Sequence, residues 1–185
     1  EAAGLLALLL LTHARSAARQ HPDGSLAPLE EQDRIRWDVR LIAEGTALLD
    51  RTLALHRPGP YQLQAAIAAL HDAAPMWAAT DWPQIALLYG ELLRLQPTPV
   101  VALNRAVAIG FSQGFEAGLH LLDALAGEPS LRGYHPLPAA QADLLRRLGH
   151  WDAAAEAYRR AIDLCGNAVE QAYFARRLRE VTGRR

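Results

Sequence analysis

The chain has 185 residues, of which 51% are hydrophobic, so it can bury a core of one domain, or of one domain with an appendage. Its 19 basic and 20 acidic side chains give a formal net charge of -1, which excludes strong bulk attraction to nucleic acid or to a membrane surface. The single cysteine, Cys165, excludes an internal disulfide and fits a reducing cytoplasm, where we expect it to be a buried, unreactive thiol.

An apolar helix opens the chain. Leucine dominates residues 5–11, and we expect a helix over residues 2–20 that is buried on most sides. The apolar run is shorter than the roughly 20 residues that cross a bilayer, and no basic segment precedes it as in a secretory signal. A chain that begins inside such a helix is expected to be part of a longer protein.

A charged stretch follows, and its pattern predicts the longest helix, over residues 30–56. One interpretation is a solvated face carrying ion pairs one helical turn apart. The other is a docking surface made by Asp33, Arg34 and Trp37, because Trp and Arg are enriched among the residues that anchor interfaces. On that interpretation, alanine at Arg34 or Trp37 weakens partner binding.

The segment Arg57-Pro58-Gly59-Pro60 is the clearest internal boundary, since Pro and Gly interrupt regular structure. We therefore predict an N-terminal helical segment over residues 1–57, packed on a repeat region over residues 58–185. Within that region, Asp81 and Thr98 are expected to cap helices that carry a proline in the first turn.

Similar turns recur along the repeat region, at Thr80-Asp81-Trp82, Gln113-Gly114-Phe115 and Leu148-Gly149-His150. A period of about 34 residues with helix-turn-helix content resembles the tetratricopeptide repeat. Ile85 and Leu119 stand where that repeat prefers alanine, so the repeat is degenerate.

Small residues in the last pair, Ala142, Ala154 and Ala161, are expected where two helices approach closely. The predicted fold is all-α: antiparallel helix hairpins stacked as a degenerate tetratricopeptide-like solenoid, preceded by two packed N-terminal helices. The alternative is an ordinary helical bundle whose spacings coincide.

Catalytic motifs are absent from the sequence. It has no Gly-rich phosphate loop, no nucleophile elbow and no paired-histidine motif, and its seven histidines lack the spacing of zinc ligands. We therefore predict no enzyme activity, no catalytic residues, no cofactor and no metal.

A second candidate binding surface is the inner groove of the repeats, which the first helix of each pair lines. The alignment of the pairs places Gln64, Asn104 and Arg105 there, amid small apolar residues. These side chains are suited to hold a peptide backbone or a carboxylate. The alternative is that the two amides bond to neighbouring backbone groups, as buried amides usually do.

Several blocks together resemble the C-terminal extension of a subgroup of extracytoplasmic-function sigma factors, of the sigma-70 family. They include LEEQDRIRWD, RPGPYQLQAAIAA and PTPVVALNRAVA, and the resemblance covers nearly the whole chain. It implies a tetratricopeptide-like module that regulates a sigma factor. The domains that read promoters and bind polymerase lie outside this sequence, and the resemblance implies no catalytic residues, because the family has none.

The expected function is thus a non-catalytic regulatory or protein-interaction domain acting in transcription initiation. Its expected partners are the parent protein's own sigma domains or core RNA polymerase, with no direct DNA binding and no membrane contact by this chain. The alternative is a helical-repeat module that senses a small molecule and controls the sigma factor. An enzyme is the least favoured interpretation.

Overall fold

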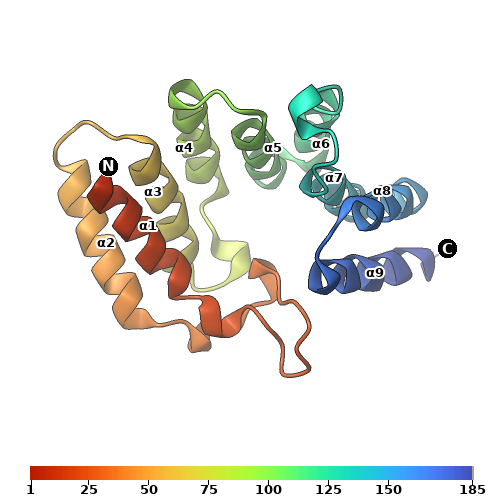
Figure 1. The fold of residues 1–185 in the computed structure, drawn as a ribbon, viewed down its shortest axis with the longest axis horizontal. Coiled ribbons are helices and arrows are strands. Elements are labelled where there is room, and N and C mark those ends of the chain that lie inside the picture. Colours follow the sequence, from red (N-terminus) through yellow and green to blue (C-terminus); the bar gives the residue numbers. More distant parts are fainter. Residues whose placement is uncertain (185) are drawn as a thin grey trace. The chain divides into compact units, whose positions relative to one another are not determined.

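The structure is a computed structural model that describes residues 1–184, and the regular elements of this part of the chain are all helices, without a β-strand (Figure 1). The α-helices are α1 (Ala2–His13), α2 (Val39–Leu53), α3 (Pro60–Ala73), α4 (Trp82–Leu95), α5 (Pro99–Gln113), α6 (Phe115–Ala124), α7 (Pro136–Arg147), α8 (Trp151–Leu164) and α9 (Ala168–Thr182). Short 3-10 helices are η1 (Ser16–Ala18), η2 (Leu29–Glu31), η3 (Arg34–Arg36), η4 (Trp77–Ala79) and η5 (Pro129–Leu131). The predicted all-α fold of helix hairpins is confirmed. None of the helices within residues 1–184 combines the length and the apolar character needed to cross a bilayer.

The chain divides into two compact units, the first from Glu1 to Pro97 and the second beginning at Thr98. Helices α1 to α4 form the first unit and α5 to α9 the second. The division predicted between residues 57 and 58 lies inside the first unit, where α3 packs on α1 as well as on α4. Whether the repeats begin at residue 58 is not tested by these contacts, so that boundary stays a prediction.

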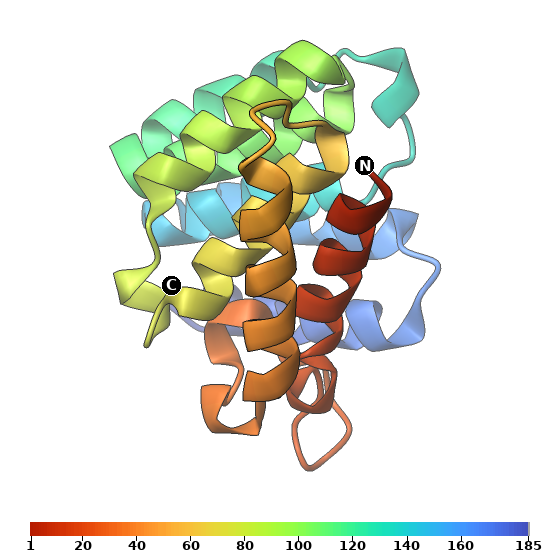
Figure 2. The same cartoon turned by 90° about the vertical axis from the view of Figure 1, so that its left-hand side faces the viewer.

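In the first unit, α1 packs against both α2 and α3, and α1 and α2 lie side by side (Figure 2). The core between these helices contains Leu11, Leu49 and Ala65. A Cβ atom at Gly45 would lie 2.8 Å from Leu11 Cγ, so the missing side chain lets α2 approach α1 closely. The buried position of α1 agrees with its leucine-rich sequence.

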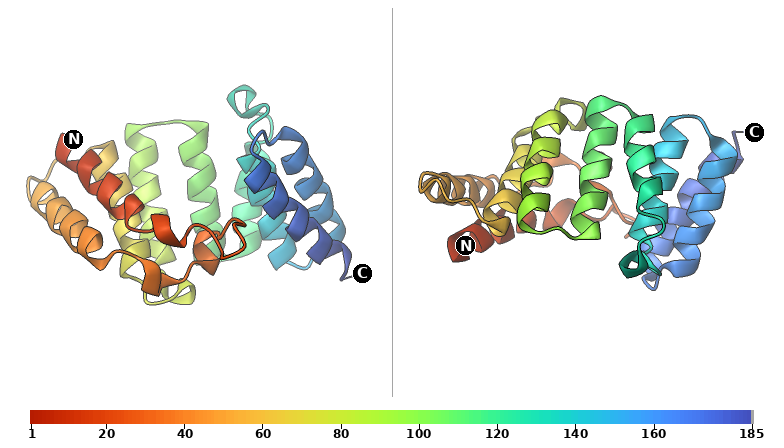
Figure 3. Two further views of the ribbon diagram at one scale, coloured as in Figure 1. Left: turned by 60° about the horizontal axis from the view of Figure 1, so that its bottom comes forward. Right: turned by 90° about the horizontal axis from the view of Figure 1, so that it is seen from above.

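In the second unit, each helix packs against the next one in the chain, from α5 through α9 (Figure 3). Ala142, Ala154 and Ala161 have no exposed surface, which confirms the prediction that small residues lie where α7 and α8 meet. Helices α5 and α6 also approach closely, because a Cβ at Gly118 would lie 2.6 Å from the Cα of Gly110. This neighbour-to-neighbour packing is typical of helical repeats.

Capping residues set the helix boundaries that the sequence predicted correctly. Asp81 Oδ1 accepts a hydrogen bond from the Gln84 N–H, and Thr98 Oγ1 accepts one from the Val101 N–H. These side chains satisfy backbone donors that the first helical turn leaves free. The second helices of the three hairpins begin at Trp82, Phe115 and Trp151, within one residue of the end of each predicted turn.

The helix predicted over residues 30–56 is wrong in its first third, since α2 begins only at Val39. Two aspartates account for the difference. Asp33 Oδ1 accepts from the Ile35 N–H, and Asp38 Oδ1 accepts from the Arg40 and Leu41 N–H groups. Such local bonds offer the backbone an alternative to a continuous helix. The helix predicted over residues 2–20 likewise ends early, at His13, and the chain continues as the 3-10 turn η1.

Candidate functional site

The charged segment over residues 29–38 belongs to the first unit and folds into the two 3-10 turns η2 and η3. The backbone N–H of Asp38 donates to Ala14 O at 2.9 Å, which attaches the segment to the end of α1. Arg36 Nη1 donates to Gln20 O at 3.2 Å. The segment is thus held at several points by backbone groups distant in sequence.

Arg34 and Trp37 are the main anchors of this segment. The Arg34 guanidinium lies 4.3 Å from the centre of the Trp37 ring, and its Nη1 donates to the carbonyl oxygens of His71 at 2.7 Å and Ala74 at 2.9 Å. These carbonyls stand at the C-terminal end of α3, where a cation also interacts favourably with the helix dipole. Trp37 is only 5% exposed, so its indole packs inside the unit.

A buried ion pair lies beside these anchors. Arg15 Nη1 is 3.5 Å from Asp72 Oδ1, and the Asp72 side chain has no exposed surface. Burial raises the pKa of Asp72 to about 6, although Arg15 and Arg34 act in the opposite direction. Burial, followed by the charges of the same two arginines, lowers the pKa of His71 to about 4. His71 is therefore neutral at pH 7.

Several buried polar atoms of this cluster have no hydrogen-bond partner within residues 1–184. They are Arg34 Nη2, Trp37 Nε1, His71 Nδ1, Asp72 Oδ2, and the two atoms of the ion pair, Arg15 Nη1 and Asp72 Oδ1, which face each other at 3.5 Å without a hydrogen bond. Unpaired buried polar groups are costly, and their concentration in one place is typical of a functional site. We therefore treat this group as the candidate site of the first unit.

A cavity of about 290 Å³ opens beside Arg15 and His71. Its other lining side chains include Thr12, Gln64 and Tyr89. Gln64 was predicted to lie in a groove, and here it faces a cavity together with a cation. The Trp77 ring stacks on the His71 imidazole at a centroid distance of 6.3 Å, and the Trp82 ring meets the imidazole and the Trp77 ring edge-on, at 5.3 and 4.9 Å.

The predicted site residues are distributed over both units. Asp33, Arg34 and Trp37 come together in the first unit, with Asp33 exposed and capping η3. Asn104 and Arg105 lie half-buried on α5, in the second unit, and Arg105 Nε is a buried donor without a hydrogen-bond partner in the described chain. Binding by any of these residues stays a prediction.

Nothing in the sequence indicated that Arg15, His71 and Asp72 form a cluster. The packing of α1 on α3 brings them together, and no local spacing marks them.

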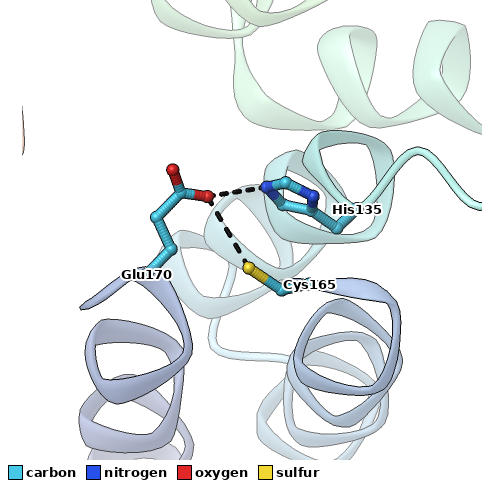
Figure 4. Close-up of side chains that lie close together, drawn as sticks. All are labelled: His135, Cys165 and Glu170. Carbon is cyan, nitrogen blue, oxygen red and sulfur yellow. Dashed lines mark hydrogen bonds and ion pairs between the residues drawn. The ribbon is translucent and has the colours of Figure 1, made fainter. Parts of the chain in front are cut away.

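A second side-chain cluster was also missed. His135, Cys165 and Glu170 each offer one atom suited to bind a metal, and these atoms all lie within 4.8 Å of one another (Figure 4). His135 Nε2 and Glu170 Oε2 are 2.7 Å apart, and Cys165 Sγ is 3.7 Å from the same oxygen. A separation of 35 positions between His135 and Glu170 conceals this arrangement in the sequence.

A third feature is an apolar cavity of about 350 Å³ between α2, α3 and α4 in the first unit. Ile42, Leu53, Ala69 and Leu88 are among its apolar lining residues, and Asp50 adds a charge. Its size and lining are in the range of small-molecule sites.

The fold thus defines a helical-repeat protein, and comparisons with known proteins add a family match. Residues 1–53 match a protein family described as a family of unknown function, DUF6596. The chain is 48% identical over 178 residues to the uncharacterized protein R00370 of Rhizobium meliloti (strain 1021). This match covers 96% of the chain but only 42% of the relative. No solved structure matches. Neither name mentions sigma factors.

Proposed function

We propose that this chain is a non-catalytic, protein-binding regulatory module of a sigma factor that acts in transcription initiation. The resemblance of the blocks given above supports it, as does the long relative, of which more than half lies outside the match. The proposed partner is the set of sigma domains in the same polypeptide. Core RNA polymerase is a further proposed partner, and no direct DNA binding is proposed for this chain.

The observation that carries the proposal is the outer face of the segment over residues 29–38. Arg34 and Trp37 hold this segment in place from inside, and Ile35 between them is 94% exposed. Val39, at the start of α2, is 72% exposed. Asp33, Arg36 and Asp38, from the same stretch of chain, are exposed as well. An apolar centre with a charged rim on a fixed backbone is the composition of a docking site.

The double substitution Ile35→Ala/Val39→Ala is expected to weaken binding to the parent's sigma domains by about tenfold or more, because apolar anchors at an interface centre carry most of its energy. Stability of the isolated chain is expected to change by less than about 0.5 kcal/mol, since both side chains are already in water. Calorimetry with the separately purified sigma domains measures the affinity.

Leu87→Ala provides the matched control, since Leu87 is an apolar side chain of α4 that is 66% exposed. Its affinity for the sigma domains is expected to equal that of the wild type. Equal binding by the double variant would remove this docking face, and no binding by the wild-type chain would count against the proposed function itself.

The apolar cavity between α2, α3 and α4 favours a second candidate function, a module that senses a small apolar molecule. An apolar fluorescent dye, anilinonaphthalene sulfonate, is expected to bind there with one site per chain. Ala69→Phe fills the cavity and is expected to weaken dye binding by about tenfold or more. Ala124→Phe, on the exposed side of α6, is the control. Unchanged dye binding in the Ala69 variant would dismiss this cavity as a sensor site.

A further inference from the structure

We propose that His135, Cys165 and Glu170 bind a divalent transition-metal ion of the zinc type. The three residues lie at the ends of three different helices of the second unit. His135 is the residue before α7, Cys165 follows the last residue of α8, and Glu170 is in the first turn of α9. Figure 4 shows one carboxylate oxygen of Glu170 facing both the ring nitrogen of His135 and the sulfur of Cys165.

All three donor atoms lie within 4.8 Å of one another, and two of their separations can be compared with those that a tetrahedral ion imposes. Zinc bonds of about 2.0 Å to nitrogen and oxygen and about 2.3 Å to sulfur place neighbouring ligand atoms roughly 3.3 to 3.6 Å apart. The Cys165 Sγ to Glu170 Oε2 distance is 3.7 Å. The His135 Nε2 to Glu170 Oε2 distance is 2.7 Å, a hydrogen bond that has to open by roughly half an ångström when an ion enters.

Neighbouring groups hold the donors in position. Asn167 Oδ1 accepts from the Val169 N–H at the start of α9, and its Nδ2 lies 3.5 Å from Glu170 Oε1, the carboxylate oxygen that faces away from the cluster. Gln171 Nε2 donates to the backbone oxygen of Cys165 at 2.5 Å. The His135 ring meets the Phe174 ring edge-on, with centroids 6.1 Å apart. Such supporting contacts limit the rearrangement that metal binding requires.

The site is closed on one side and open on the other. Cys165 is 4% exposed, whereas the side chains of His135 and Glu170 are partly accessible. An ion can therefore enter from solvent and keep a water molecule as its fourth ligand, as in zinc sites with three protein ligands. One imidazole, one thiolate and one carboxylate favour zinc or a similar ion over magnesium or calcium, which prefer oxygen ligands alone.

A bound ion would connect the start of α7 with the α8–α9 connection. Since a metal that binds only the folded state stabilises that state, the second unit is expected to melt at a higher temperature when zinc is present. The metal would then serve a structural role in this module.

Cobalt(II) is the probe for the test, because a thiolate-to-cobalt charge-transfer band reports a bond to cysteine. Cys165 is the only cysteine in the chain, so such a band is assigned without ambiguity. The full chain, freed of metal with a chelator, is expected to bind one cobalt ion with this band, at about micromolar affinity or tighter. Zinc is expected to displace the cobalt and to raise the melting temperature.

Cys165→Ser is expected to abolish the band, and His135→Gln and Glu170→Gln are each expected to weaken binding by more than about 100-fold, since even residues that only orient ligands contribute 10–100-fold. His120→Gln, an exposed histidine of α6, is the matched control and keeps the wild-type affinity. Circular dichroism of each metal-free variant confirms that it is folded. Absence of the band in the wild type, or an equal affinity in folded His135 and Glu170 variants, overturns the proposal.

Discussion

Arg34→Ala is expected to lower the free energy of unfolding of the first unit by about 3 kcal/mol or more. Two charge-assisted hydrogen bonds to the carbonyl oxygens of His71 and Ala74 are lost, each contributing about 1.5–3 kcal/mol. The cation–π contact with Trp37, at 4.3 Å, adds about 0.5–2 kcal/mol. The carbonyl groups at the end of α3 then lose their partner, although water can replace part of the loss.

Arg34→Lys is expected to recover only part of this stability. Lysine keeps the charge, but its single nitrogen cannot reproduce a planar guanidinium that stacks on an indole while bonding two carbonyl groups. Urea unfolding followed by tryptophan fluorescence is the measurement, because Trp37, Trp77 and Trp82 all belong to the first unit.

Arg40→Ala is the matched control for Arg34→Ala. Arg40 is exposed on the first turn of α2, and its removal is expected to change stability by less than about 0.5 kcal/mol. If Arg34→Ala were as stable as Arg40→Ala, the guanidinium would be free for the docking role that the sequence predicted. If it is unstable, weaker partner binding by that variant reports unfolding, and Ile35 and Val39 become the residues that test docking.

The sequence predicted helix positions well wherever short-range chemistry sets them. Asp81 and Thr98 each place one oxygen beside the N–H groups of the following turn, so cap and helix start are determined within four residues. The segment around Asp33 and Asp38 shows how the same chemistry misleads. Its composition favours a helix, but each aspartate bonds to the N–H two residues on and starts a new turn.

The candidate sites depend on contacts that have no short-range signal. Arg15 and Asp72 meet only because α1 packs on α3, and His135 and Glu170 only because α7 and α9 lie on either side of α8. Trp37 was recognised as an important residue, but its burial follows from the position of Arg34 above the end of α3. Residue types could therefore be selected from the sequence, whereas their partners and their exposure required the tertiary structure.

Asp72 and His71, two buried groups of the first unit, are expected to give opposite pH dependences of stability. The pKa of Asp72 is about 6 in the folded protein, whereas its ordinary value is 3.8. The stability that this group contributes is therefore present below about pH 4 and is lost as the pH rises through 6. The pKa of His71 is about 4 in the folded protein and 6.5 ordinarily, so its contribution is present above pH 6.5 and is lost as the pH falls through 4.

Between pH 4 and pH 6 the two contributions largely cancel in the wild-type chain, and single substitutions are expected to reveal them. One pKa unit corresponds to about 1.4 kcal/mol, so each group changes the free energy of unfolding by up to about 3 kcal/mol. Relative to the wild type, Asp72→Asn is expected to gain stability as the pH rises from 4 to 6, and His71→Gln is expected to lose it. Urea unfolding at several pH values, followed by tryptophan fluorescence, measures both slopes.

The double variant Asp72→Asn/His71→Gln is the control, and its pH profile is expected to run parallel to that of the wild type. The two slopes are expected to be independent. Burial and the charges of Arg15 and Arg34 set the pKa values of both Asp72 and His71, and neither of these two groups shifts the pKa of the other. Single variants whose profiles parallel the wild type would show that Asp72 and His71 titrate normally. In that case the cluster would be open to water, and its unpaired polar atoms would no longer mark a site that a ligand or partner completes.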